Sequence, residues 1–174
     1  MSLSLLLGAE SAKIKEVIAY AKTFIGVRYF WPDAQDAADG AIQQGNDDPI
    51  AGFDCAGYVS ELCRAGGWLP NLEADPGYVD GYRPDRWDTN DFWTLYPRVA
   101  KPAPGCLVLY GENDDTGHVS FVISKHHIIE AGGGGHGTTD DEECARDNGF
   151  VRIRPITWRA SEIMGYVKPF TSSI

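Results

Sequence analysis

Cys55 stands at the start of a predicted helix, a position that favours a reactive thiol. Asp54 precedes it as a capping residue, apolar side chains follow at helical spacing, and Gly66 and Gly67 end the pattern. The unpaired amide groups at a helix N-terminus stabilise a thiolate. They also leave the Cys55 backbone N–H free to donate to an oxyanion on an attacked carbonyl. This one segment therefore predicts a nucleophile together with one oxyanion contact.

His118 is the best-placed of the histidines to act as general base for this thiol. It opens a predicted strand directly after a turn at residues 114–117. By contrast, His126 and His127 lie in a predicted hairpin turn, and His136 lies in a glycine run, where solvated side chains are expected. We therefore predict that His118 acts as the general base, and we predict no metal site and no cofactor.

Glu130 is the candidate for a third catalytic residue. If residues 118–123 and 126–131 form a hairpin centred on Ser124, His118 lies directly opposite Glu130. Directly opposed residues share one face of the sheet with Cβ atoms roughly 4.5–5.5 Å apart, so a carboxylate there can orient an imidazole. The predicted triad is thus Cys55, His118 and Glu130.

The remaining pattern predicts an α+β domain whose N-terminal helices pack on a central antiparallel sheet. Apolar residues recur at helical spacing over residues 11–25, with Ser11 as the cap and Gly26 after the end. After Pro104 the apolar runs are short and bounded by turn residues, which is typical of strands. The predicted strands are Cys106–Tyr110, His118–Ser124, His127–Ala131, Phe150–Ile156 and Gly165–Pro169.

A length of 174 residues fits one domain with a core of its own, so residues 1–174 are predicted to form a single unit. Residues 31–52 are rich in Asp, Gln, Gly and Ala, and we interpret them as an insertion or lid. Prolines spread through residues 68–104 exclude long regular elements, so an ordered loop region with short helical turns is expected.

Several of these segments resemble the NlpC family of papain-like cysteine peptidases, which act on the bacterial cell wall. Residues 53–59 resemble the family's nucleophile motif, and residues 104–108 and 117–120 look like its Gly-Asp-Leu and Gly-His-Val strands. Upstream, residues 26–31 are similar to a Gly-x-x-Tyr-x-Trp segment whose tyrosine, here Tyr29, lies near the catalytic cysteine. The resemblance covers residues 11 to 131 and implies a papain-like NlpC-type fold.

The resemblance also implies roles for particular residues. The family's third polar residue, commonly histidine, follows its catalytic histidine by about one hairpin and matches Glu130. Ala56 stands where the family usually has serine, and the interval from Tyr29 to Cys55 is longer than is typical, so the bond cleaved stays open. The candidate substrate-binding residues are Tyr29, Asp54, Ala56 and Ser120.

The resemblance implies hydrolysis of peptidoglycan stem peptides, with the D-glutamyl-diaminopimelate bond as the expected target. One alternative keeps the thiol chemistry but cuts between muramic acid and L-alanine, as amidases of the CHAP type do. The other alternative is a non-catalytic domain that binds the wall or forms part of a phage tail.

The net charge of the chain bears on which partners it can bind. The formal net charge of −10 opposes binding to nucleic acid, because polyanions are repelled. The same charge gives no help in adsorbing to an anionic wall. Residues 1–9 lack the basic start of a signal peptide, and no run approaches transmembrane length, so delivery by a phage lysis cassette, a tail or a secretion system is expected. Nothing in the sequence indicates an oligomeric state.

Overall fold

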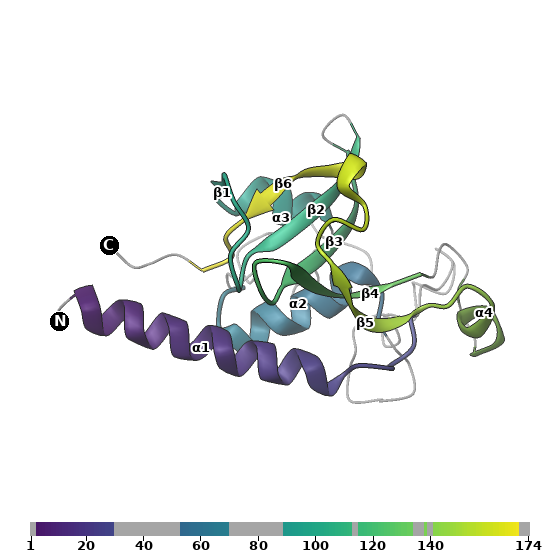
Figure 1. The fold of residues 1–174 in the computed structure, drawn as a ribbon, viewed down its shortest axis with the longest axis horizontal. Helices are drawn as coiled ribbons and strands as arrows, with labels where there is room; N and C mark the ends of the chain where they lie inside the picture. Colours follow the sequence, from purple (N-terminus) through teal and green to yellow (C-terminus); the bar gives the residue numbers. More distant parts are fainter. Residues whose placement is uncertain are drawn as a thin grey trace, which may run out of the picture.

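The computed structural model describes residues 3–29, 53–69, 89–112, 115–133, 138 and 141–170. Within these residues the chain forms a six-stranded antiparallel sheet with strand order β1-β6-β2-β3-β4-β5, accompanied by helices (Figure 1). The predicted α+β class is confirmed. The helices are α1 Leu3–Thr23, α2 Cys55–Gly66, α3 Thr89–Leu95, α4 Asp141–Arg146 and the short 3-10 helix η3 Ala160–Glu162. The strands are β1 Arg98–Val99, β2 Leu107–Glu112, β3 Asp115–Val122, β4 His127–Gly132, β5 Phe150–Pro155 and β6 Ile163–Val167.

The predicted insertion at residues 31–52 lies outside the described residues. Of the predicted loop region at 68–104, the described part contains only short elements, α3 and β1. In the part of the chain that the structure describes, no helix is both long enough and apolar enough to span a bilayer.

Helix α1 starts earlier than the sequence pattern predicted. It begins at Leu3 rather than Ser11 and ends at Thr23, and Gly26 adopts a φ of 89° in the turn that follows. The prediction was wrong because it took Ser11 as a cap, although the residues before it are mostly leucine and other good helix formers that continue the helix. A capping residue type marks a start only where nothing helical precedes it.

Helix α2 confirms its prediction at both ends. The Asp54 side chain accepts a hydrogen bond of 2.5 Å from the backbone N–H of Gly57, as an N-cap should. Gly67 ends the helix in the left-handed conformation with a φ of 69°, which glycine adopts at no steric cost. The Tyr58 hydroxyl donates to the carbonyl of Ala21 at 2.8 Å, which joins α2 to α1 (Figure 1).

Both faces of the sheet carry buried apolar side chains, as the alternation in the sequence predicts. The face toward α1 and α2 includes Leu107, Leu109, Val119, Phe121, Ile129 and Ala131, packed with Tyr58, Val59 and Leu62 of α2. The opposite face carries a second cluster of Cys106, Val108, Tyr110, Val122, Ile128 and Ile156. Alternation along β3 places His118 and Ser120 on this second face, so polar groups lie within an otherwise apolar layer.

The five predicted strands are all present, but β3 begins at Asp115 and not at His118. It does so because Glu112 pairs with Asp115 across the β2–β3 hairpin, beyond a bulge between Tyr110 and Gly111. His118 therefore lies inside a strand, where it pairs with Tyr110 of β2. The sequence pattern missed the elements β1, α4 and η3, whereas α3 is one of the short helical turns expected within residues 68–104.

The register of the β3–β4 hairpin also differs from the prediction. Phe121 pairs with Ile129 and Val122 with Ile128, so the hairpin is centred on residue 125 and Glu130 aligns with Ser120 instead of His118. The cause lies in the turn, where the hydroxyl of Ser124 accepts hydrogen bonds from the backbone N–H groups of residues 126 and 127. Because the error is an even number of residues, Glu130 stays on the face of His118.

Candidate active site

A short segment after α1 brings Tyr29 beside the start of α2. Tyr29 forms a parallel bridge with Phe53, and the Phe53 N–H donates to the carbonyl of Arg28 at 3.1 Å. On its other side the same segment pairs with the start of β5. Burial raises the pKa of the Tyr29 phenol, and the neighbouring Cys55 and Asp54 raise it further. The tyrosine is thus held near the candidate nucleophile, as the resemblance implied.

The structure brings together the three residues predicted to form a triad. His118 Nε2 lies 2.8 Å from Glu130 Oε2, and the Cys55 thiol is close enough to the imidazole to raise its pKa. Cys55 and His118 retain 6% and 7% exposure, whereas Glu130 is fully buried. The carboxylate therefore lies behind the imidazole, and the thiol lies in front of it.

The electrostatics favour a protonated His118. Burial alone lowers the pKa of the imidazole, but hydrogen bonds with Cys55 and Glu130 outweigh that effect and raise it to about 9. For the Glu130 carboxyl, burial has the opposite effect and raises the pKa, but His118, Ser120 and Arg154 together lower that pKa below its usual value. Near neutral pH this site therefore holds an imidazolium against a carboxylate, which is the charge state that stabilises a neighbouring thiolate.

The other predicted site residues have different surroundings. Ser120 is fully buried, and its hydroxyl donates to Glu130 Oε2 at 3.0 Å, so it lies behind His118 and not at a substrate surface. Asp54 is used in capping α2, and Ala56 is buried in the first turn of that helix. Among the predicted substrate-binding residues, Tyr29 lies close enough to Cys55 and Asp54 for both to raise the pKa of its phenol.

Two arginines that the sequence analysis did not single out flank Glu130. Arg154 Nε lies 2.9 Å from Glu130 Oε1, and Arg152 Nε lies 3.9 Å from the same oxygen. Both come from β5, where Arg152 pairs directly with Glu130. The sequence shows two arginines two residues apart on a predicted strand. Only the β4–β5 pairing shows that these arginines lie beside Glu130.

The remaining cysteines lack this environment. Burial raises the pKa of the thiols of Cys63 and Cys106, which keeps them protonated. All four cysteines are free and buried. Of the thiols, Cys55 is the one that combines a helix N-terminus with a histidine partner.

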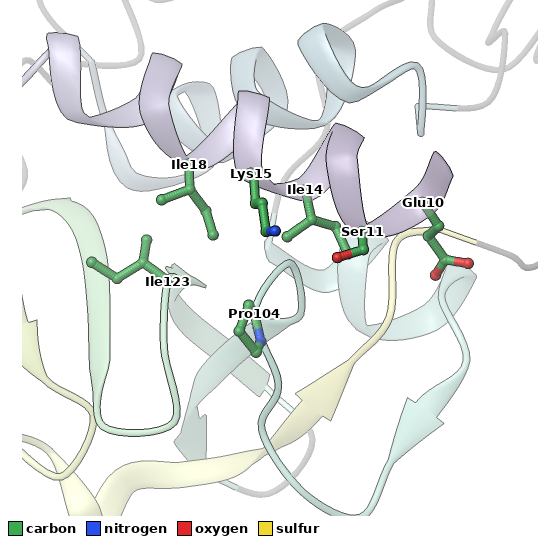
Figure 2. A pocket seen from close by; sticks show the side chains of 7 residues that line it. All are labelled: Glu10, Ser11, Ile14, Lys15, Ile18, Pro104 and Ile123. Carbon is green, nitrogen blue, oxygen red and sulfur yellow. The ribbon is translucent and has the colours of Figure 1, made fainter. Parts of the chain in front are cut away.

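A separate cavity of about 470 Å³ lies between α1 and the β3–β4 turn (Figure 2). Figure 2 shows the side chains of Ile14, Ile18 and Ile123 near one another across it, with Pro104 below α1. The cavity lining contains no member of the predicted triad. Among the described residues there is also no group of three His, Cys, Asp or Glu side chains arranged to hold a metal ion.

Comparisons with known proteins agree on the fold. No family model matches the sequence, and no curated protein matches it. Solved structures do match. An NlpC/P60 family protein from Bacillus cereus superposes with a TM-score of 0.59 and 16% identity, covering 91% of this chain and 40% of that one. RipB, a peptidoglycan hydrolase from Mycobacterium tuberculosis, gives a TM-score of 0.57 and 21% identity, covering 92% of this chain and 66% of its own.

A third match broadens the functional range of this fold. RipD from M. tuberculosis, described as a non-catalytic NlpC/p60 domain protein adapted to peptidoglycan binding, has a TM-score of 0.53 at 19% identity and covers 90% of this chain and 95% of its own. The chain therefore has the NlpC/P60-type fold, and the fold class predicted from sequence is confirmed. It spans less than half of the B. cereus protein and about two thirds of RipB.

Proposed function

We propose that this chain is a cysteine peptidase that hydrolyses stem-peptide bonds of peptidoglycan, with the D-glutamyl-diaminopimelate bond as its target. The observation that carries the proposal is the placement of His118 between the Cys55 thiol and the buried Glu130 carboxylate. The NlpC/P60-type fold of peptidoglycan hydrolases such as RipB supports the choice of substrate class.

In the first half of the reaction, Cys55 Sγ attacks the scissile carbonyl carbon. The developing oxyanion accepts a hydrogen bond from the Cys55 backbone N–H, which is unpaired at the first position of α2. His118, as an imidazolium, then gives its proton to the leaving amine, so the C–N bond breaks and a thioester remains. Glu130 keeps the imidazole oriented and stabilises its positive charge.

In the second half, water replaces the departed amine. Neutral His118 takes a proton from that water, the resulting hydroxide attacks the thioester carbonyl, and the C–S bond breaks. The Cys55 thiolate and the His118 imidazolium are restored together with a free carboxylic acid. The place of action is the cell wall, reached by phage lysis, a tail or a secretion route.

An amidase that cuts between muramic acid and L-alanine would use the same residues, because the chemistry at the carbonyl is identical. Only the groups that bind the flanking substrate distinguish the two, and Ala56 provides no hydroxyl there. Product identification therefore separates these alternatives, and the geometry of the triad does not.

A non-catalytic wall-binding domain is the second candidate function, because RipD combines a comparable fold with peptidoglycan binding. The free energy needed to bury the Glu130 carboxylate argues against this second candidate. A fully buried carboxylate is expensive to keep unless its partners compensate it, and here those partners include the histidine that faces the thiol. A binding role alone gives no reason for that arrangement.

The experiment is muropeptide mass spectrometry after incubating purified peptidoglycan with wild-type protein, Cys55→Ala and Cys63→Ala. Cys63 lies on the same helix but is fully buried, so its variant is the matched control for loss of a thiol. New fragments from wild type and Cys63→Ala, and none from Cys55→Ala, are expected. Fragments ending between muramic acid and L-alanine would favour the amidase, and tight binding without fragments would favour the binding domain.

A further inference from the structure

The two oxygens of the Glu130 carboxylate have different partners. Oε2 accepts from Ser120 at 3.0 Å and lies 2.8 Å from His118 Nε2. Oε1 instead lies 2.9 Å from Arg154 Nε, with Arg152 Nε farther away at 3.9 Å. Among the described residues neither Oε1 nor Arg154 Nε has a hydrogen-bond partner, so the contact between them is an ion pair and not a directional hydrogen bond. A carboxylate with a partner at one oxygen alone can rotate about its last bond, whereas a cation at the second oxygen opposes that rotation.

Arg154 is itself held in place. Its guanidinium carbon lies 3.9 Å from the ring centroid of Trp158, so the side chain is stacked as well as charged. Its side chain is 28% exposed, against 0% for Glu130, so it reaches from the surface of the protein to the buried acid. Arg152 has a competing partner, because its guanidinium donates to the carbonyl of Gly132 at 2.7 Å.

The other groups facing Glu130 do not replace Arg154. His118 and Ser120 on β3 contact Oε2, and Tyr110 on β2 lies with its ring centroid 5.6 Å from that of His118. Glu130 raises the pKa of the buried Tyr110 phenol, after burial itself, so that phenol stays neutral and adds no positive charge. The positive charges on the Oε1 side come from β5.

We propose that Arg154 is a positioning residue for the thiol–imidazole pair, acting through Glu130. By holding Oε1 it fixes Oε2 against His118 Nε2, and this stabilises the imidazolium that accompanies the Cys55 thiolate. The proposal rests on the proposed thiol chemistry but not on the identity of the substrate. It also accounts for a glutamate at a position where the resembling family commonly has histidine, because a buried carboxylate needs a cation that a histidine does not need.

The test follows alkylation of Cys55 by iodoacetamide at neutral pH, with peptide mapping to assign the modified thiol. This readout needs no peptidoglycan, so a chain that alkylates rapidly but cleaves nothing contradicts the proposed substrate without affecting the test of Arg154. Cys63 and Cys106 are internal references, because burial keeps their thiols protonated.

The decisive comparison is a double-mutant cycle. Arg154→Met should slow alkylation of Cys55 about tenfold in the natural background, equivalent to about one pKa unit of lost imidazolium stabilisation. In a Glu130→Gln background the same change should add nothing, because no carboxylate remains to be positioned. Arg154→Lys, which keeps the charge but not the planar fork, should recover part of the rate and covers the case in which Arg154→Met fails to fold.

Arg98→Met is the matched control. Arg98 also stacks on a tryptophan, Trp93, at 3.9 Å, but it lies on β1 at the other edge of the sheet from β5. Its loss should leave the alkylation rate unchanged. Equal slowing by Arg154→Met in both backgrounds would mean a merely structural role and would overturn the proposal. Faster alkylation would overturn it too, since removal of a cation that acts only through space makes the imidazolium more stable.

Discussion

The β3–β4 hairpin carries a serine–histidine pair at each end, and the two pairs differ in everything except distance. Ser120 Oγ lies 3.3 Å from His118 Nε2, and Ser124 Oγ lies 3.3 Å from His127 Nδ1. The first pair is buried against Glu130, whereas the second lies in an exposed turn. Proximity of a hydroxyl and an imidazole therefore does not define a reactive site. Burial, a carboxylate partner and a neighbouring thiol distinguish the first pair from the second.

The pairs also serve different purposes in the fold. In the turn, the Ser124 hydroxyl accepts hydrogen bonds from the backbone N–H groups of residues 126 and 127, so it sets the register of the hairpin. In the buried pair, the Ser120 hydroxyl donates to a side chain and helps to neutralise a buried charge. Ser124 therefore stabilises the turn of the backbone, and Ser120 stabilises the ionised Glu130 carboxylate.

The largest expected effect comes from removing one imidazole of each pair. His118→Ala should reduce stem-peptide cleavage about 10³-fold, because the same imidazole supports both proton transfers. His127→Ala should change the rate by less than about twofold, because His127 is exposed at the start of β4 and has no carboxylate partner among the described residues. The measurement is the initial rate of muropeptide release. Comparable losses from both substitutions would remove the distinction drawn between the two ends.

A smaller effect is expected when the carboxylate that distinguishes the pairs is neutralised. Glu130→Gln should lower kcat/KM about 10²-fold and move the alkaline limb of its pH profile downward. The sign follows because Cys55 and the Glu130 carboxylate together raise the pKa of His118 to about 9, so that loss of the carboxylate lets the imidazolium deprotonate nearer its usual value. The wild-type alkaline limb should therefore lie near pH 9.

His127→Ala provides the reference profile for this substitution, since it removes an imidazole without touching Glu130. Its alkaline limb should coincide with that of the wild type. If the alkaline limb of the pH profile stayed in place in Glu130→Gln, another group would set the high-pH titration. That result would contradict the proposed role of His118 as an imidazolium.

How much of this could be read from the sequence depends on whether the determinants are local. The start of α2 was predictable because Asp54, Cys55 and the terminal glycines act within the helix itself. The start of α1 was not, because Ser11 has the residue type of a cap but lies within a run that continues the helix. The pairing of Cys55 with His118 was predicted from the helix N-terminus at Cys55 and the predicted strand that His118 opens, with the resemblance added, and the structure brings the two side chains together.

The parts that escaped prediction depend on neighbours across the sheet. The hairpin register was misplaced because a single serine hydroxyl decides the turn, and the apolar alternation constrains a register only to within an even number of residues. Arg152 and Arg154 were missed because their value comes from lying beside Glu130 on the adjacent strand. A pattern along one strand shows which face a residue occupies but not which charge it meets there.

The smallest expected effect comes from removing the two hydroxyls. Ser120→Ala should lower the cleavage rate by less than about tenfold and the free energy of unfolding by about 1–2 kcal/mol, because a buried carboxylate loses one donor but keeps His118 and Arg154. Ser124→Ala should leave the rate unchanged and cost about 1 kcal/mol of unfolding free energy through lost turn hydrogen bonds. Urea denaturation and initial rates measure both.

The two substitutions thus test whether Glu130 is positioned by the backbone of the hairpin or by the direct partners of its carboxylate. If Ser124→Ala lowered the rate as much as Ser120→Ala, the register of the hairpin would be the property that holds Glu130 against His118. If Ser120→Ala alone lowers it, the carboxylate is held by its own partners, and the turn contributes only to stability. The second result is expected, because the Glu130 carboxylate has its own contacts with His118, Ser120 and Arg154, and β4 is also paired with β5 from His127 to Gly132.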